Sequence, residues 1–305
     1  MKLIFATRPS KLARWQTTWV IDALQASHPD LECTENVITT RGDKILDKPL
    51  PEIGGKGLFT QELETELLNG TMDAAVHSLK DLPVENPPGL TLGAIPIRAD
   101  VRDALVSESG YSIKTLPEGA KIGTSSPRRA AQLLALRPDL NIADIRGNVD
   151  TRLRKLFEGQ YDAVVFAAAG LLRLGFDAEL KEKMHFLTFD EMLPAPGQGA
   201  MSVQCRNDAN KTLGLLAAIE HLPTRLAVTA ERTFLAGLGG GCAVPVAAYA
   251  EYNLETSEIT LTGLVSSLNG KKAIKVMGKG NDAEKLGREL SEEALAQGAV
   301  DILSA

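Results

Sequence analysis

The first two hundred residues of the chain repeat one local pattern, in which a short apolar run leads through a turn into an amphipathic segment. The first run covers 2–6, and the segment over 10–26 then places Leu12, Trp15 and Trp19 at helical spacing. Strands that alternate with helices predict an α/β fold built on sheets that are largely parallel. Further strand-like runs follow at 31–39, 72–77, 90–96, 104–106, 120–123, 140–145, 161–167 and 200–205.

The pattern changes after residue 240. Three strand-like runs, at 246–252, 258–265 and 272–277, are joined by short polar turns, and a helical segment at 283–297 closes the chain. We therefore expect a small C-terminal α+β domain, different in style from the preceding part. Polarity rises around 98–102, where we place a domain boundary, and the segment 193–200 combines two prolines with two glycines, which predicts a hinge-like linker.

Composition and charge exclude several classes of protein. With 305 residues, 44% of them hydrophobic, the chain can form packed cores in two or three domains. The net charge is −6, whereas nucleic-acid-binding domains are commonly basic, so we expect no nucleic-acid partner and only local anion sites. No apolar stretch reaches about 18 residues, which predicts no membrane span. The apolar run at the N-terminus is too short for a signal peptide, so we expect a cytoplasmic protein.

The cysteines and histidines give no metal signature. The chain has three cysteines and four histidines, with no C-x-x-C pair and no ligand spacing between histidines. We therefore predict no metal site and no disulfide framework, as expected in a reducing compartment. Cys242 follows a run of three glycines, which allows close approach of another group to its thiol. It is either a covalent anchor or an inert cysteine in a tight turn.

Cations recur where a strand passes into a helix. The run Thr124-Ser125-Ser126-Pro127 predicts a helix start, and two arginines, Arg128 and Arg129, occupy its first turn. The helix dipole disfavours cations there, so their presence favours a bound anion over a solvated helix cap. Arginine suits carboxylate or phosphate groups, and the repeated placement implies a ligand with several negative charges. The other arginines at such junctions are Arg8, Arg146, Arg152 and Arg173.

Two further segments carry polar groups in positions that suit a site. Residues 77–83 place His77, Lys80 and Asp81 after an apolar strand, at the edge where open α/β sheets bind ligands. Alternatively, Lys80 and Asp81 form a surface pair. The turn-rich segment 40–57 contains Lys56 between glycines, and it is either a mobile lid over an anion or a plain surface loop.

Taken together, these motifs resemble the porphobilinogen deaminase (hydroxymethylbilane synthase) family over essentially the whole chain. The motifs are Ala6-Thr7-Arg8 with Ser10, Gly54-Gly55-Lys56-Gly57-Leu58-Phe59, His77-Ser78-Leu79-Lys80-Asp81-Leu82-Pro83, Gly123-Thr124-Ser125-Ser126-Pro127-Arg128-Arg129, Arg146-Gly147-Asn148-Val149 with Thr151-Arg152-Leu153, Ala167-Ala168-Ala169-Gly170-Leu171, Leu193-Pro194-Ala195 with Gly197-Gln198-Gly199, and Gly240-Gly241-Cys242.

The resemblance implies a fold and an activity. The fold has two α/β lobes similar to type II periplasmic binding proteins, over 1–96 with 197–216 and over 97–196. A C-terminal α+β domain with a three-stranded antiparallel sheet covers 217–305 and carries the cofactor cysteine. The implied enzyme is a monomeric transferase of tetrapyrrole (haem) biosynthesis. It condenses four porphobilinogen units, with loss of ammonia, onto a dipyrromethane held by a thioether, and hydrolysis then releases the linear hydroxymethylbilane.

The resemblance also assigns roles to residues. Cys242 would attach the dipyrromethane, and Asp81 would be the catalytic group that aligns the pyrrole nitrogens and stabilises positive charge. Gln204 and Arg14 depart from the residues expected there, an acidic and an apolar one. The residues implied in cofactor or substrate binding are Arg8, Ser10, Lys56, Phe59, Ser78, Lys80, Thr124, Ser126, Arg128, Arg129, Arg146, Asn148, Arg152, Arg173 and Gln198.

Two other functions compete with this interpretation. A two-lobed binding protein for a small polyanion would use the same lobes and arginines without chemistry, but it leaves Cys242 and Asp81 unexplained. A cysteine hydrolase would need a base near Cys242, and the sequence around that residue offers no histidine.

Overall fold

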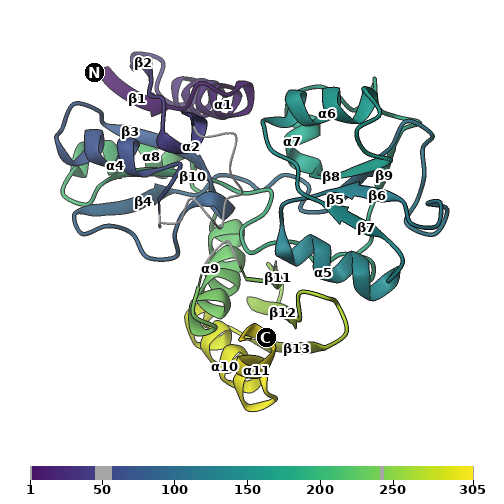
Figure 1. Cartoon of the computed structure of the whole chain (residues 1–305). Helices are drawn as coiled ribbons and strands as arrows, with labels where there is room; N and C mark the ends of the chain where they lie inside the picture. Colours follow the sequence, from purple (N-terminus) through teal and green to yellow (C-terminus); the bar gives the residue numbers. More distant parts are fainter. Residues whose placement is uncertain (1, 45–56, 241–243, 305) are drawn as a thin grey trace.

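The computed structural model describes residues 2–44, 57–240 and 244–304, which form two α/β lobes side by side and a third, smaller domain beneath them (Figure 1). In this view α9 (Leu222–Gly237) runs from the lobes down into the third domain. The predicted fold class, two lobes of the type II periplasmic-binding-protein kind with a small α+β domain, is confirmed.

The first lobe is a five-stranded sheet in the order β2-β1-β3-β10-β4. β1 is parallel to β2 and β3, whereas β10 is antiparallel to both of its neighbours, β3 and β4. Alternate side chains of β1 point to opposite faces, so Phe5 packs with α1 residues and Ala6 with α4 residues. The bounds are β1 Lys2–Thr7, α1 Lys11–Ser27, β2 Glu32–Val37, α2 Arg41–Lys44, α4 Gln61–Leu68, β3 Ala74–Ser78, η1 Leu79–Asp81, β4 Leu90–Ala94, β10 Met201–Arg206, α8 Asn210–Leu216 and η2 Ala217–Ile219.

The second lobe repeats this plan with the order β7-β6-β8-β5-β9. Here β6 is parallel to β7 and β8, and β5 is antiparallel to β8 and β9. The chain enters this lobe through β5 and returns to the first lobe through β10, so it crosses between the lobes twice. The bounds are β5 Asp103–Val106, β6 Lys121–Gly123, α5 Pro127–Leu136, β7 Asn141–Ala143, α6 Val149–Phe157, β8 Ala163–Ala167, α7 Ala168–Arg173 and β9 Met184–Phe186.

The two crossings run against each other at the base of the cleft between the lobes. Ala99 N donates to Gly199 O over 3.2 Å. Gly199 has a φ of +83°, and a Cβ there would lie 2.7 Å from Ala99 O, so only glycine allows this approach. The linker predicted at 193–200 is therefore packed tightly at this point.

The third domain is an antiparallel sheet, β11 (Val246–Asn253), β12 (Glu258–Ser266) and β13 (Ala273–Gly280), in that order. One face packs on α9, α10 (Ala283–Ala296) and α11 (Ala299–Leu303) around the fully buried Phe234. A Cβ on Gly263 would lie 2.3 Å from the Phe234 ring, so this glycine makes room for the aromatic side chain.

Most predicted elements are present, with differences at short ones. The helix start predicted at 124–127 is confirmed, since Ser126 caps α5 with Pro127 in its first turn. Ser10 caps α1 by accepting from Ala13 N. The three-residue strand β9 and the one-turn helix α2 were not predicted, because such short elements depend on tertiary contacts.

Candidate active site

A cleft of about 570 Å³ lies between the two lobes and is lined by both of them. Of its lining residues in the described part of the chain, seven are lysine or arginine and three are aspartate. The cleft is therefore cationic within a protein of net charge −6. The predicted site residues that line it are Arg8, Ser10, Phe59, Ser78, Lys80, Asp81, Ser126, Arg129, Arg146, Asn148 and Arg152.

Arg8 stands in the turn that follows β1. Its guanidinium forms an ion pair with Asp43 and lies 4.3 Å from the centre of the Phe59 ring. Asp43 also accepts from the main-chain N and side-chain hydroxyl of Thr40. Burial alone would raise the pKa of Asp43, but Arg8 and Thr40 outweigh it and lower that pKa. Gly42 packs beneath Phe59, since a Cβ there would lie 2.2 Å from the ring.

Lys80 and Asp81 lie in the 3-10 turn η1, directly after β3. Lys80 Nζ donates to Gln198 Oε1 over 3.2 Å. Burial, together with the positive charge of Arg129, lowers the pKa of Lys80 to about 8. Asp81 is exposed in the cleft, and within the described ranges its carboxylate makes no hydrogen bond or ion pair. The alternative of a Lys80–Asp81 surface pair is therefore not realised, and Asp81 is available to a ligand.

Helix N-termini build the opposite wall. Ser126 precedes α5, and Asn148 precedes α6, so both helices direct their first turns toward the cleft. Arg152 Nε donates to Gly147 O over 2.7 Å, which fixes the side chain over the start of α6. Burial and the nearby charges of Arg129 and Arg146 lower the pKa of Arg152 to about 10, so it stays cationic at neutral pH.

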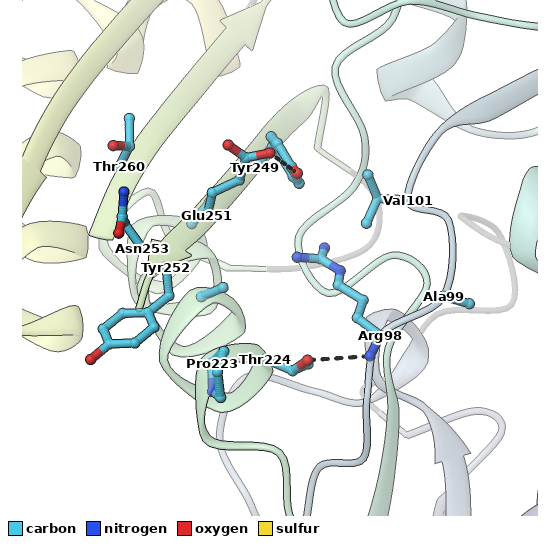
Figure 2. A pocket seen from close by; sticks show the side chains of 12 residues that line it. Arg98, Ala99, Val101, Pro223, Thr224, Tyr249, Glu251, Tyr252, Asn253 and Thr260 are labelled. Carbon is cyan, nitrogen blue, oxygen red and sulfur yellow. Dashed lines mark hydrogen bonds between the residues drawn. The ribbon is translucent and has the colours of Figure 1, made fainter. Parts of the chain in front are cut away.

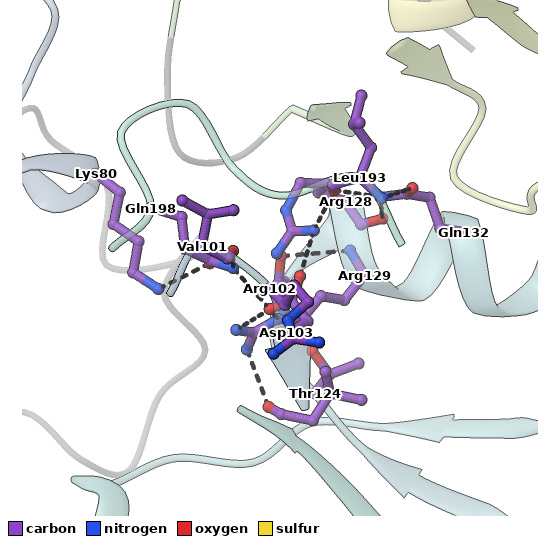
Figure 3. Close-up of polar contacts among 12 residues, drawn as sticks. Lys80, Val101, Arg102, Asp103, Thr124, Arg128, Arg129, Gln132, Leu193 and Gln198 are labelled. Carbon is purple, nitrogen blue, oxygen red and sulfur yellow. Dashed lines mark hydrogen bonds and ion pairs between the residues drawn. The ribbon is translucent and has the colours of Figure 1, made fainter. Parts of the chain in front are cut away.

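A fully buried carboxylate, Asp103 at the start of β5, stands behind this wall (Figure 3). It forms ion pairs with Arg128 (2.8 Å) and Arg129 (2.7 Å) and accepts from Gln198 Nε2 over 3.1 Å. Burial alone would raise the pKa of Asp103, but the two guanidiniums dominate and hold it far below its usual range. Asp103 thus supplies a negative charge to the two arginines in the first turn of α5, and the prediction that they also bind an anionic ligand stays a prediction.

Four predicted residues lie behind the cleft and do not line it. Thr124 Oγ1 accepts from Ser126 N over 3.2 Å, and Arg128 donates to Leu193 O over 2.7 Å. Arg173 ends α7, donates to Gly199 O over 2.8 Å and lies over the Trp15 ring. Gln198 connects Lys80 of the first lobe to Asp103 of the second (Figure 3). Two other predicted residues, Lys56 and Cys242, lie outside the described residues, as does most of the segment predicted to be a lid.

Two residues of this region, Asp103 and Gln16, were not predicted from the sequence, and His77 was predicted only as a polar group after a strand. Asp103 is a single acid at the start of an apolar strand, and this position could have indicated a buried carboxylate. Gln16 lines the cleft from α1 and donates to Ser78 Oγ over 2.9 Å. His77 was noted only for its position, yet it lines the cleft at 6% exposure, and burial lowers its pKa to about 4.

A second pocket, of about 550 Å³, lies where the crossing segments meet the third domain (Figure 2). Its charged wall is Arg98, whose guanidinium is bound to Glu231 at 2.7 and 3.0 Å, while Arg98 N donates to Thr224 Oγ1. Tyr249 on the same wall donates to Glu251. Because these polar groups are engaged with one another, the cleft between the lobes is the better candidate for the active site.

Across residues 2–44, 57–240 and 244–304, no cluster of three or more His, Cys, Asp or Glu side chains is arranged to hold a metal ion. No helix within the same ranges combines the length and hydrophobicity needed to cross a membrane.

A cationic cleft between two similar lobes, with a carboxylate (Asp81) that makes no hydrogen bond or ion pair among the described residues, is suited to a small polyanion. Residues 3–214 match the family model described as porphobilinogen deaminase, dipyromethane cofactor binding domain, and residues 225–296 match the porphobilinogen deaminase C-terminal domain. The chain therefore belongs to the porphobilinogen deaminase family, whose cofactor is dipyrromethane.

Two relatives agree with this assignment, whereas the solved structure given last shows only a weak overall similarity. A porphobilinogen deaminase from Brevibacillus brevis is 51% identical over 298 residues, covering 98% of this chain and 95% of that protein. One from Roseiflexus sp. is 52% identical over 303 residues, covering 99% and 98%. Among solved structures, the VFT2 domain of BvgS from Bordetella pertussis matches with a TM-score of 0.43 and 16% identity, covering 72% of this chain and 86% of that one.

Proposed function

We propose that the chain is a hydroxymethylbilane synthase, which condenses four porphobilinogen units with loss of ammonia and releases the linear tetrapyrrole by hydrolysis. The observation that carries this proposal is Asp81, an exposed carboxylate in a cleft that holds seven cationic side chains. Porphobilinogen supplies the matching chemistry, because it carries two carboxylates for the cations and a pyrrole N–H for the aspartate.

The residues present suit dipyrromethane, which is itself an acidic, N–H-bearing molecule. When bound, the cofactor supplies a nucleophilic pyrrole carbon to which the product chain is anchored. The proposed attachment point is the thiol of Cys242. Arg8, Arg129, Arg146 and Arg152 would bind its carboxylates and those of the substrate, since guanidinium groups form paired hydrogen bonds with carboxylates.

Asp81 has the central role in the proposed mechanism. Departure of ammonia leaves positive charge on the substrate pyrrole, and a carboxylate that accepts the pyrrole N–H stabilises that charge. The same carboxylate can help to move the proton that each newly joined ring must lose. The cations on both walls would hold a product whose negative charge grows by two carboxylates with each added unit.

The other predicted ligands divide according to their position. Ser10, Ser78, Ser126 and Asn148 line the cleft and can offer hydrogen bonds to a ligand. Phe59 can stack beside it. Thr124, Arg128, Arg173 and Gln198 lie behind the wall, from which they would act mainly through the side chains in front of them. The predicted contact of Lys56 with the ligand stays a prediction.

The deciding experiment is the intact mass of the purified protein under denaturing conditions. We expect an excess equal to two pyrrole units in the wild type and in Cys33→Ala, and none in Cys242→Ala. An unmodified wild type would be incubated with porphobilinogen and measured again. If the excess still failed to form, the deaminase proposal would be wrong, and the polyanion-binding protein would become the better interpretation.

The resemblance to the family also carries two finer proposals, that the protein is a monomer and that it works in the cytoplasm. Light scattering coupled to size exclusion tests the first, and fractionation of the host cell tests the second. Binding of nucleic acid is not expected from a protein of net charge −6.

A further inference from the structure

Arg232, on the helix α9, contacts the segment that carries Asp81 from behind. Its guanidinium donates to four main-chain carbonyls: Leu79 and Leu82 at 3.3 Å each, Pro83 at 2.7 Å and Val84 at 3.0 Å. These carbonyls lie on both sides of Lys80-Asp81 in the chain. Arg232 is only 8% exposed and sits about 150 residues away in sequence, so this is a specific long-range contact between α9 and the first lobe.

The Asp81 segment has few main-chain hydrogen bonds of its own. Leu79 N donates to Ala200 O over 3.0 Å, and Leu82 N donates to Leu79 O over 3.2 Å. Pro83 has no N–H and cannot extend the turn into a regular element. Buried carbonyls need hydrogen-bond donors. Arg232 supplies donors to carbonyls of this segment that lie outside a regular helix or sheet. The apolar part of the contact is the packing of Leu79 and Leu82 with Val228, one turn earlier on α9.

The same helix leads toward the cysteine. α9 ends at Gly237, and Cys242 follows ten residues after Arg232. Gly240, at the described end of this connection, lies near the Asp81 segment, since a Cβ added to it would lie 3.8 Å from Val84 Cγ2. One helix thus joins the segment of the proposed catalytic carboxylate to the segment of the proposed cofactor attachment.

We propose that Arg232 is a positioning residue that fixes the backbone around Asp81 against α9. The inference rests on the proposed function, since it assigns Arg232 an effect on catalysis that is exerted through Asp81. It does not follow from the family assignment, which places cations in the cleft, whereas Arg232 is not among the residues that line the cleft in the described part of the chain.

The test compares Arg232→Gln and Arg232→Lys with Arg225→Gln, a control on the same helix. Arg225 lies two turns earlier, pairs with Glu220 and donates to Leu92 O over 3.2 Å, so it also ties α9 to a first-lobe strand. We expect Arg232→Gln to keep the mass of the attached cofactor but to lower kcat about 10- to 100-fold, with KM changed less than threefold. Arg232→Lys should recover part of kcat. Arg225→Gln should lose a similar amount of thermal stability and keep kcat within twofold.

A double variant separates positioning from general destabilisation. If Arg232 acts through Asp81, then Arg232→Gln combined with Asp81→Asn should be no slower than Asp81→Asn alone. A multiplicative loss in the double variant, or a kcat of Arg232→Gln within twofold of wild type, would overturn the proposal. If Arg232→Gln does not fold, Arg232→Lys takes its place, alone and combined with Asp81→Asn, and the same comparison of kcat values tests the proposal. A wild type without turnover would instead contradict the proposed function itself.

Discussion

The two walls of the cleft come from lobes with the same strand order, yet they place their acidic residues differently. In the first lobe both acids face the cleft: Asp43 pairs with Arg8 at the wall, and Asp81 is exposed. In the second lobe the acid that lines the cleft, Asp150, pairs with Lys11 of the first lobe, and a further acid, Asp103, is fully buried behind the wall, where it pairs with Arg128 and Arg129.

This difference separates two kinds of chemistry on one fold. An acid behind the wall holds arginines in place by ion pairs and leaves the surface of the cleft cationic. A cationic surface suits the binding of carboxylates. An acid in the cleft can itself meet the substrate, which suits stabilisation of positive charge and proton transfer. Under the proposed function, the first lobe would therefore supply the catalytic carboxylate and the second lobe most of the carboxylate-binding arginines. Gln198 connects the two lobes through Lys80 and Asp103 (Figure 3).

The largest effect should come from the catalytic side. We expect Asp81→Asn to keep the fold, because Asp81 makes no hydrogen bond or ion pair with the described residues, and to lower kcat by about 100-fold or more. Steady-state kinetics with porphobilinogen, alongside thermal unfolding, measure both effects. A kcat near that of the wild type would remove the catalytic role of Asp81 and with it the contrast between the walls.

The next effect should fall on stability in the second lobe. Asp103→Asn leaves Arg128 and Arg129 buried without their carboxylate, and breaking such a cluster costs about 3–5 kcal/mol. Urea unfolding measures this loss. Asp43→Asn is the matched change in the first lobe, and it should lose less, because Arg8 and Asp43 both retain access to solvent. Equal losses would mean that the position of the acid does not distinguish the lobes.

The sequence predicted the fold well because the features that specify it are local. The helix start at Ser126-Pro127 and apolar runs such as Ala163–Ala167 in β8 carry their own signals. Five of the seven cations that line the cleft were also predicted, because they stand near strand ends, and the strand ends of a parallel sheet meet at one edge; Lys11 and Lys155 were not.

The features of the site that the sequence did not predict depend on contacts between distant parts of the chain. Asp103 meets Arg129 across 26 residues and Gln198 across 95, and no local pattern pairs these residues. Gly42 leaves room for the ring of Phe59, and the two residues meet only in the folded protein. Sequence spacing likewise could not tell Arg129, which lines the cleft, from its neighbour Arg128, which lies behind it, because both lie in the first turn of the same helix.

A smaller effect concerns acid sensitivity of the first lobe, where His77 is buried beside the cleft. Burial lowers its pKa to about 4 in the folded protein, against about 6.5 when unfolded. As pH falls below 6.5, the unfolded chain takes up this proton first, so folding stability falls by about 2–3 kcal/mol between pH 7 and pH 4.5. Urea unfolding at both pH values should show a smaller difference in His77→Gln. His185→Gln, in the second lobe, is the control and should keep the full difference.

The smallest effect should come from a single cation on the binding wall. Arg146→Leu removes one guanidinium among several, and a hydrogen bond to a charged group contributes about 1.5 kcal/mol, or roughly tenfold in rate or affinity. We expect a rise in KM and an accumulation of partly elongated enzyme in intact-mass spectra, in contrast to the loss of kcat in Asp81→Asn. Arg154→Gln, an exposed change on α6, should alter neither value. If Arg146→Leu lowered kcat alone and left the distribution of intermediates unchanged, the second lobe would share in catalysis, and the division of labour between the walls would not hold.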